Sequence, residues 1–276
     1  VLGEGPLWHP ERGELFWFDI VSQKLYHRTA GDLRQWQFGE PVSAAGWLDR
    51  DSLLIASASS LSRFDIESGH SEVVVPLEDG HPFTRSNDGR ADPYGGFWIG
   101  TMGCAHEEKA GTIYRYYRGE VRALYSGITV PNAICFSPDG VVAYFTDTMQ
   151  GQVMRQNLDL ADGWPVGEPE VFLDIRGEKF GADGAVVDAE GNFWNARYGG
   201  YSVARYSPDG ELQETLSLPT VYVTCPAFGA ADLSNLYVTS CCRNMSESKR
   251  RGQPDAGKTF VFETSTKGQA EHRVVL

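Results

Sequence analysis

Cysteine is scarce in this sequence and follows no recognisable ligand or disulfide spacing. The 276 residues contain five cysteines, an odd number, with no CxxC pair and no HExxH motif. Cys241 and Cys242 are adjacent and could bridge each other only with strain. These features argue against a disulfide framework and favour a reducing compartment. Because charged residues interrupt the N-terminal stretch, it does not resemble a secretory signal, and we expect a cytoplasmic protein.

Positive charge and long apolar runs are also lacking. Lysine and arginine number 24 against 37 aspartates and glutamates, which gives a formal net charge of −13. Such an acidic chain is not expected to bind nucleic acid or an anionic membrane surface. The longest uncharged run, residues 215–231, contains two prolines and a glycine, so we do not expect it to span a membrane. Nothing in the sequence indicates an obligate protein partner.

No stretch of ten residues or more shows helical periodicity, whereas short β-branched and aromatic runs alternate with tight turns throughout. Strand–turn–strand units open at a glycine or alanine, and successive openings are 41 to 51 residues apart. This spacing is typical of propellers. We therefore predict an all-β fold, a six-bladed β-propeller with a central channel, formed by residues 1–276 as a single domain and completed by closing strands at 259–263 and 272–276. The predicted openings are Gly5, Gly46, Gly89, Ala133, Gly184 and Gly229.

An oxygen-bearing side chain precedes the opening residue in three units, namely Glu4, Asn132 and Asp183. Because the inner strands of a propeller line one channel, these residues are expected to converge at one mouth, and Asp88 holds the corresponding place in the third unit. Two ionised carboxylates about 5 Å apart repel by roughly 3 kcal/mol at an effective dielectric constant near 20. Such a pair needs a cation, a shared proton or water. The set predicts one divalent cation, with Ca, Mg or Mn favoured and Zn possible, although Zn would lack its usual His or Cys ligands. The alternative is that these side chains cap strand starts or bond within the channel.

Two features flank this predicted cluster. Arg85 could hold substrate hydroxyl or carboxylate oxygens, or form a salt bridge at the rim. The polar segment 241–258 is long for a connection, so it is either disordered or a loop over the site. The Ser-Pro-Asp-Gly runs at 137–140 and 207–210 suit type I turns, and their aspartates are not site candidates. We find no phosphate-binding glycine loop and no Ser–His–Asp arrangement supported by spacing.

Short motifs follow one another in a fixed order along nearly the whole chain: GEGPLW at 3–8, NDGRADP at 87–93, GTM at 100–102, Asn132 ahead of FSPDG at 136–140, DT at 147–148, DG at 183–184 and CPAFG at 225–229. In this order they resemble the SMP-30/gluconolactonase family, which includes regucalcin-type proteins and bacterial sugar lactonases. The resemblance implies a six-bladed propeller with one divalent ion at the channel mouth. Ala133 stands where the family usually has glycine.

The same resemblance implies roles for individual residues. Glu4, Asn132 and Asp183 match metal ligands, and Asp183 also matches the proposed general base. Substrate-binding positions of the family match Arg85 and Asn87. A further substrate-contacting glutamate of the family aligns with Glu107 or Glu108, of which we select Glu107.

Taken together, residues and resemblance predict a divalent-metal-dependent hydrolase that opens a small sugar lactone, an aldonolactone, by attack of water. One alternative is a Ca-binding or regulatory propeller without turnover, and a second is a scaffold that binds proteins at its rim. The catalytic alternative requires metal-dependent proton release from lactones. The regulatory alternative requires metal affinity without turnover, and the scaffold requires no metal.

Overall fold

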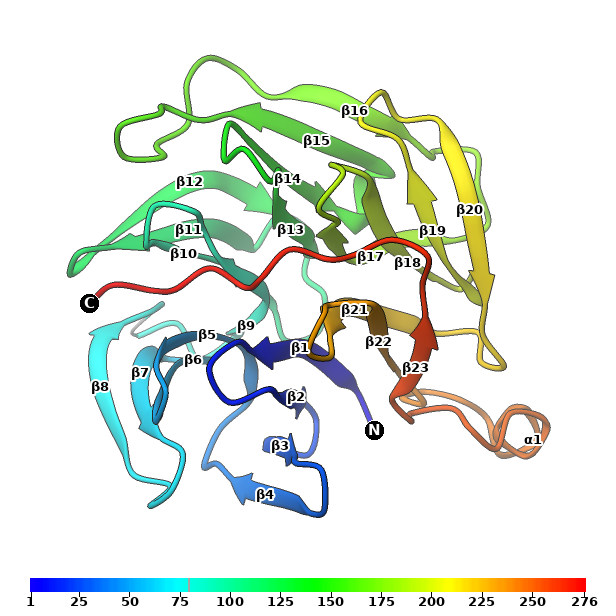
Figure 1. Ribbon diagram of the computed structural model, residues 1–276, viewed down its shortest axis with the longest axis horizontal. Coiled ribbons are helices and arrows are strands. Elements are labelled where there is room, and N and C mark those ends of the chain that lie inside the picture. Colours follow the sequence, from blue (N-terminus) through cyan, green and yellow to red (C-terminus); the bar gives the residue numbers. More distant parts are fainter. Residues whose placement is uncertain (79) are drawn as a thin grey trace.

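The structure is a computed structural model that describes residues 1–78 and 80–276, and it forms a ring of six antiparallel sheets around a central channel (Figure 1). Among the described residues, five sheets have four strands each and the sheet formed last along the chain has three. Within every sheet the strands follow chain order, from the channel outwards. We number the sheets blades 1 to 6 along the chain. The predicted six-bladed β-propeller is confirmed.

The innermost strand of each blade lines the channel and is packed between its neighbours, so most of its residues are buried. These strands are rich in small and apolar residues, because six of them must approach one axis. They are β1 (Gly3–His9), β5 (Val42–Asp49), β9 (Thr84–Ala91), β13 (Pro131–Phe136), β17 (Gly181–Val187) and β21 (Val223–Gly229).

The second and third strands supply most of the large apolar side chains between blades, among them the fully buried Trp98 and Trp194. The second strands are β2 (Glu14–Asp19), β6 (Ser52–Ser57), β10 (Phe97–Gly103), β14 (Val142–Asp147), β18 (Phe193–Tyr198) and β22 (Asn235–Ser240). The third strands are β3 (Lys24–Arg28), β7 (Ser60–Asp65), β11 (Gly111–Tyr117), β15 (Gln152–Asn157), β19 (Ser202–Tyr206) and β23 (Phe260–Glu263).

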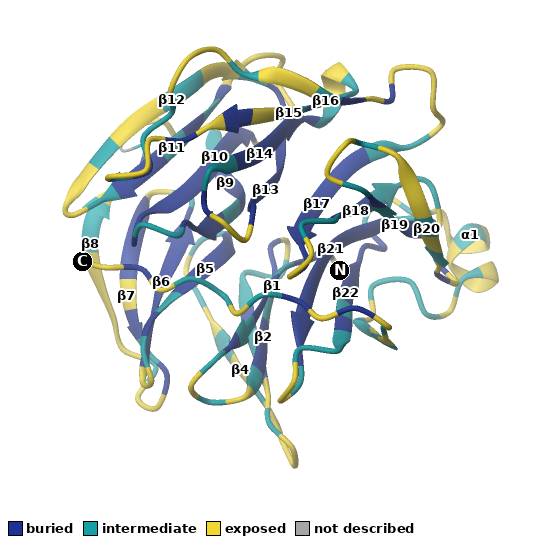
Figure 2. Ribbon diagram, turned by 45° about the horizontal axis from the view of Figure 1, so that its top comes forward, coloured by how far each residue is buried: buried dark blue, intermediate teal, exposed yellow. Residues whose placement is uncertain are grey.

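The outermost strands face solvent, and few of their residues are buried (Figure 2). Each has one free edge, and polar or charged side chains at that edge oppose pairing with another chain. They are β4 (Leu33–Gln37), β8 (Ser71–Pro76), β12 (Glu120–Ile128), β16 (Glu170–Asp174) and β20 (Leu212–Ser217).

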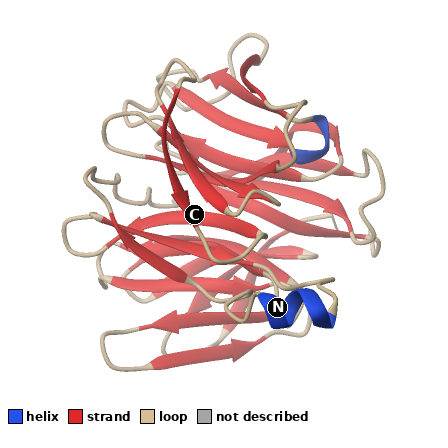
Figure 3. Cartoon of the chain, turned by 90° about the vertical axis from the view of Figure 1, so that its right-hand side faces the viewer, coloured by secondary structure: helices blue, strands red, loops and turns tan. Residues whose placement is uncertain are grey.

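Helix is limited, in the described part of the chain, to the 3-10 turn η1 (Thr148–Gln150) and the helix α1 (Glu247–Gly252) (Figure 3). The helix lies in segment 241–258, which is therefore an ordered loop, one of the two predicted alternatives. Both Ser-Pro-Asp-Gly runs form turns, closed by hydrogen bonds from Gly140 to Ser137 and from Gly210 to Ser207, each 2.9 Å. None of the described helices is both long and apolar enough to cross a membrane.

A register shift interrupts the pairing of every inner strand near the end that carries the predicted site. In β1 it lies between Glu4 and Leu7, and in β13 between Asn132 and Cys135. Gly5 and Ala133 adopt the left-handed conformation there, with φ of 50° and 58°. A bulge adds a residue and re-aims the side chains beside it. These bulges therefore determine which side chains face the channel mouth.

Two predicted unit openings are misplaced. Gly46 lies in the middle of β5 and Gly229 ends β21, whereas the register shifts nearest the predicted site fall at Ser43 in β5 and just after Val223 in β21. Both glycines serve close packing instead, since a Cβ at Gly46 would meet Val274 at 2.5 Å and one at Gly229 would meet Trp8 at 2.7 Å. Spacing alone therefore locates a blade but not its first residue.

The predicted closing strand at 259–263 is present as β23, but the one at 272–276 is wrong. Residues 264–276, which we call the C-terminal strap, cross the channel mouth opposite the predicted site instead (Figure 1). Gln269 Nε2 donates to the carbonyl oxygens of Phe136 and Val187 at the ends of two inner strands, at 2.8 and 3.1 Å. In place of sheet pairing, the strap satisfies its polar groups on the ends of the blades it crosses.

Candidate active site at the channel mouth

A cavity of about 240 Å³ lies at the mouth opposite the strap, where the predicted residues meet. Glu4, Arg85, Asn87, Asn132 and Asp183 all line it, although they come from four different blades. The rest of the lining is largely apolar or neutral and comes from second strands and loops: Leu2, Met102, His106, Val130, Thr148, Met149, Tyr198, Cys241, Arg243 and Asn244.

The two carboxylates at this cavity are buried and have little compensation. Glu4 and Asp183 are each 6% exposed. Glu4 accepts one backbone hydrogen bond from Gly5 at 3.3 Å, and Asp183 one from Gly184 at 3.1 Å. Neither forms an ion pair with any described residue. Burial and the charge of Asp88 raise the pKa of Glu4 to about 8, and burial together with Glu4 raises the pKa of Asp183 well above its usual value.

A chain of hydrogen bonds crosses three blades beside these carboxylates. Arg85 Nη1 donates to Asn87 Oδ1 at 2.9 Å, and Asn87 Nδ2 donates to Asn132 Oδ1 at 3.0 Å. Asn132 Nδ2 donates to Thr148 Oγ1 at 2.8 Å, and that hydroxyl donates to the carbonyl oxygen of Ala182 at 2.7 Å. The chain fixes the Asn132 oxygen next to the carboxylates, where it keeps one acceptor lone pair for a ligand.

The donor set at the cavity fits a hard divalent cation. In the described part of the chain, no three His, Cys, Asp or Glu side chains group as a metal site. A cation here would therefore rely on Glu4, Asp183 and the amide oxygen of Asn132, with water or substrate completing its shell. The mutual repulsion of the buried carboxylates is what such an ion would relieve. Oxygen ligands without imidazole or thiolate suit Ca, Mg or Mn better than Zn.

Asp88 does not reach the cavity, contrary to its predicted equivalence with the three ligand positions. The bulge of β9 turns Asn87 towards the mouth and leaves Asp88 buried below, where its Oδ2 accepts from the Ile134 N–H at 2.8 Å. Asn87 donates both to Asn132 and, at 2.9 Å, to the Pro131 carbonyl oxygen. With its amide hydrogens used in this way, Asn87 offers a substrate an acceptor and no donor.

Neither Glu107 nor Glu108 lines the cavity. Glu107 folds back on its own loop and accepts from the Ala105 N–H at 3.0 Å, while the exposed Glu108 lies 3.8 Å from Lys109. His106 occupies the rim position instead, in a left-handed conformation with φ of 64°. The loop after β10 thus presents a histidine where a glutamate is expected.

Sequence reasoning missed other lining residues, above all Arg243 and Tyr198. They come from a loop and from the end of a second strand, and no repeated motif marks either place. Thr148 had a usable signal, because Asp147 before it caps η1 and accepts from the Met149 N–H. An Asp–Thr pair at the end of an apolar strand predicts a turn that points back over the channel mouth.

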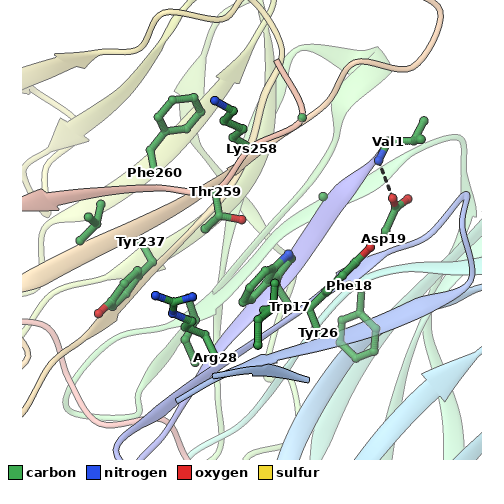
Figure 4. A pocket seen from close by; sticks show the side chains of 15 residues that line it. Val1, Trp17, Phe18, Asp19, Tyr26, Arg28, Tyr237, Lys258, Thr259 and Phe260 are labelled. Atoms are coloured by element: carbon green, nitrogen blue, oxygen red, sulfur yellow. Dashed lines mark hydrogen bonds and ion pairs between the residues drawn. The ribbon is translucent and has the colours of Figure 1, made fainter. Parts of the chain in front are cut away.

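A second, larger cavity of about 550 Å³ lies between blades 1 and 6 (Figure 4). Its wall includes Trp17 and Tyr26, stacked with ring centroids 5.3 Å apart. The carboxylate of Asp19, on this wall, accepts from Ser22 Oγ at 2.8 Å and from the N–H groups of Leu2 and Ser22, each at 3.1 Å. Because this carboxylate is already hydrogen-bonded three times, the cavity lacks the uncompensated carboxylates that mark the channel mouth.

Fold and site together define a β-propeller with a small cavity at the mouth of its channel, lined by two carboxylates without an ion-pair partner and by a buried arginine. The model of the SMP-30/gluconolactonase/LRE-like region matches residues 2–242. The chain belongs to this family.

Known proteins of this kind align over almost the full chain. A Rhizobium meliloti (strain 1021) protein provisionally named a sugar lactone lactonase is 42% identical over 272 residues, covering 98% of this chain and 92% of its own. The 6-deoxy-6-sulfogluconolactonase of Pseudomonas putida is 33% identical over 277 residues, covering 98% and 94%. A solved structure of regucalcin, described as a calcium-binding protein, from Agrobacterium tumefaciens str. C58 has a TM-score of 0.98 at 40% identity, covering 100% of this chain and 94% of that chain.

Proposed function

We propose that the protein is a lactonase that opens a small sugar lactone by attack of water, with a divalent cation held by Glu4, Asn132 and Asp183. The observation that carries this proposal is the pair of buried carboxylates without an ion-pair partner, next to Arg85 in a cavity of about 240 Å³. The names of two relatives, a sugar lactone lactonase and a 6-deoxy-6-sulfogluconolactonase, support the reaction class. The calcium-binding description of regucalcin supports the cation.

The residues of the cavity divide the work. When bound, the cation would polarise the lactone carbonyl and stabilise the negative charge that develops on its oxygen. Asp183 accepts the proton of the attacking water and can return it to the ring oxygen as the acyl C–O bond of the lactone breaks, a role usually worth about 10²–10⁴-fold in rate. Its ionised form is needed for this step, and a neighbouring cation favours that form against the effect of burial.

Arg85 orients the substrate. Only its Nη1 hydrogen bonds to described residues, to the Ser86 carbonyl oxygen at 2.8 Å and to Asn87. The remaining donors are free for the hydroxyl or carboxylate oxygens of a ligand. Asn87 holds this guanidinium in place and offers an acceptor for a ring hydroxyl. The apolar residues Leu2, Met102 and Val130 exclude water from the rest of the wall.

The test is proton release from a panel of aldonolactones, followed with a pH indicator after exhaustive chelation and again after addition of Ca, Mg, Mn or Zn. Activity is expected only with a divalent ion. Asp183→Asn should lower kcat by at least about 10²-fold at saturating metal and substrate, whereas Glu4→Gln should recover much of its rate when metal is saturating.

Asp209→Asn, the same change in an exposed turn, is the matched control and should behave as wild type. Full activity in a sample shown by elemental analysis to be metal-free would refute the metal requirement. Equal recovery of the Asp183 and Glu4 variants would reduce Asp183 to a ligand. Metal binding by calorimetry without turnover of any lactone would favour the regulatory alternative.

A further inference from the structure

One wall of the cavity is cationic, and the proposed hydrolysis of a neutral lactone gives a role to only part of it, namely Arg85. The wall is formed by Arg85 of blade 3 and Arg243 of the loop before α1, and His106 of the loop after β10 lines the cavity with them. Arg243 lies close enough to Arg85 that, after burial, its charge is the next cause that lowers the pKa of Arg85, to about 10. The same two guanidinium groups follow burial in lowering the pKa of His106.

These guanidinium groups form no ion pair with a described residue, although Glu4 and Asp183 are near enough to raise the pKa of Arg85. No carboxylate among the described residues lies within 4.0 Å of either group, although most other arginines of the chain pair with an acid. Arg85 is 6% exposed, so water cannot fully solvate it. Two like charges held close together without an ion-pair partner, one buried and one half-buried, are costly, and a ligand that supplies the opposite charge relieves that cost.

The sum of the charges at the cavity also favours an anionic ligand. Glu4 and Asp183 lie beside Asn132, and their charges would be neutralised by one divalent cation. Arg85 and Arg243 then leave two positive charges at the cavity, and the buried Asp88 carboxylate below, whose charge raises the pKa of Glu4 and of Asp183, can offset at most one of them, so an excess of positive charge remains. A neutral lactone cannot balance this excess, because it carries no charge until it reacts. A lactone that already bears an anionic group can.

We propose that the substrate is a sugar lactone that carries an anionic group, namely a carboxylate, phosphate or sulfonate, away from the ring carbonyl. Arg243 binds this group together with Arg85. The inference rests on the proposed lactonase function and specifies its substrate class. Arg243 is half-buried on a loop, so its side chain can adjust to the ligand without disturbing a blade. It is a specificity-determining residue in this assignment.

The kinetic test compares gluconolactone, which is neutral, with glucarolactone, which carries a terminal carboxylate, and with 6-phosphogluconolactone. Wild type is expected to prefer the charged lactones in kcat/KM. Arg243→Gln should lower kcat/KM for the charged lactones by at least about 10-fold, mainly through KM, and change the neutral lactone little. Arg243→Lys should retain part of the preference. Arg251→Gln removes the same charge from the exposed end of α1 and is the matched control.

A binding readout keeps this inference separate from the proposed function. Calorimetry with the stable ring-opened acids should show glucarate, a dianion, binding more tightly than gluconate, and Arg243→Gln should abolish most of the difference. If lactones are hydrolysed but the neutral one is preferred, or if Arg243→Gln affects both lactones equally, the inference is wrong and the lactonase proposal stands. If no lactone is hydrolysed, the lactonase proposal fails, and equal binding of the two acids then refutes the cationic wall as well.

Discussion

Removal of one carboxylate at the channel mouth should stabilise the cation-free protein, and the gain should grow with pH. Glu4 has a pKa of about 8 in the folded state against a usual value of 4.5, because it is buried next to other carboxylates. Folding therefore favours its protonated form. Below pH 4.5 Glu4 is protonated in both the folded and the unfolded state and does not reduce the free energy of unfolding. As the pH rises from 4.5 to about 8, Glu4 ionises only in the unfolded state, so the free energy of unfolding of the wild type falls. Glu4→Gln keeps the shape of the side chain without the charge.

The magnitude follows from the same pKa. A pKa that differs by one between the folded and unfolded protein corresponds to about 1.4 kcal/mol, so the interval from 4.5 to about 8 amounts to at most about 5 kcal/mol. Water entering the cavity weakens the repulsion, which makes this an upper figure. In a chain of this size 1 kcal/mol corresponds to about 2–4 °C in Tm. Cation-free wild type should therefore lose up to roughly 10–20 °C relative to Glu4→Gln between pH 5 and pH 8.5.

The assay is urea unfolding of chelated protein at half-unit steps across this pH range, for wild type, Glu4→Gln and the exposed control Glu108→Gln. The wild-type and control curves should fall together, and the Glu4→Gln curve should be flatter. Calcium at a hundred times its dissociation constant should return about 2.7 kcal/mol to wild type and less to Glu4→Gln. Parallel curves for wild type and Glu4→Gln would refute the repulsion that underlies the metal assignment.

Two further predictions concern the framework of the site. Glu271→Gln leaves the buried Arg90 without its ion-pair partner on the C-terminal strap, so the free energy of unfolding should fall by about 3–5 kcal/mol. The control Glu263→Gln changes an exposed position and should alter the free energy of unfolding little. Calorimetric melting measures both variants. Gly184→Ala places a Cβ at 2.4 Å from Cys225 Sγ, so it should lower the free energy of unfolding by about 1–3 kcal/mol. The same clash should displace the neighbouring Asp183 and reduce activity. The control Gly31→Ala, whose Cβ meets nothing within 4 Å, should keep both stability and activity.

The features that the repeat of strand–turn–strand units determines could be predicted from the sequence. The spacing of turn glycines predicts the six blades, since each blade must return the chain to the axis after a similar length. It also brings Glu4, Asn132 and Asp183 to one cavity, as observed. The strap was missed because its last residues, His272–Leu276, have the alternation of a strand, yet the surfaces they meet are strand ends rather than a free sheet edge.

The side chains from loops could not be predicted in the same way. Arg243 and His106 reach the cavity through the paths of two loops, and a loop path has no period from which a facing side can be read. Asn87 lines the cavity as predicted, but the predicted equivalence of Asp88 with the ligand positions was wrong for a different reason. Adjacent residues of a strand face opposite sides, so one extra residue at a bulge exchanges which of them faces the channel.

The bulges also explain why a third carboxylate lies buried beneath the site without joining it. Ala133 holds a left-handed conformation, which costs a residue with a Cβ about 1–2 kcal/mol. This turn directs the Ile134 N–H to Asp88 Oδ2 at 2.8 Å, so the carboxylate of blade 3 fixes the bulge of blade 4. Burial raises the pKa of Asp88 to about 6 even though this hydrogen bond opposes the change. Because Asn132 immediately precedes Ala133, this hydrogen bond of Asp88 helps to position the amide oxygen of Asn132, and the carboxylates that line the cavity are those of Glu4 and Asp183.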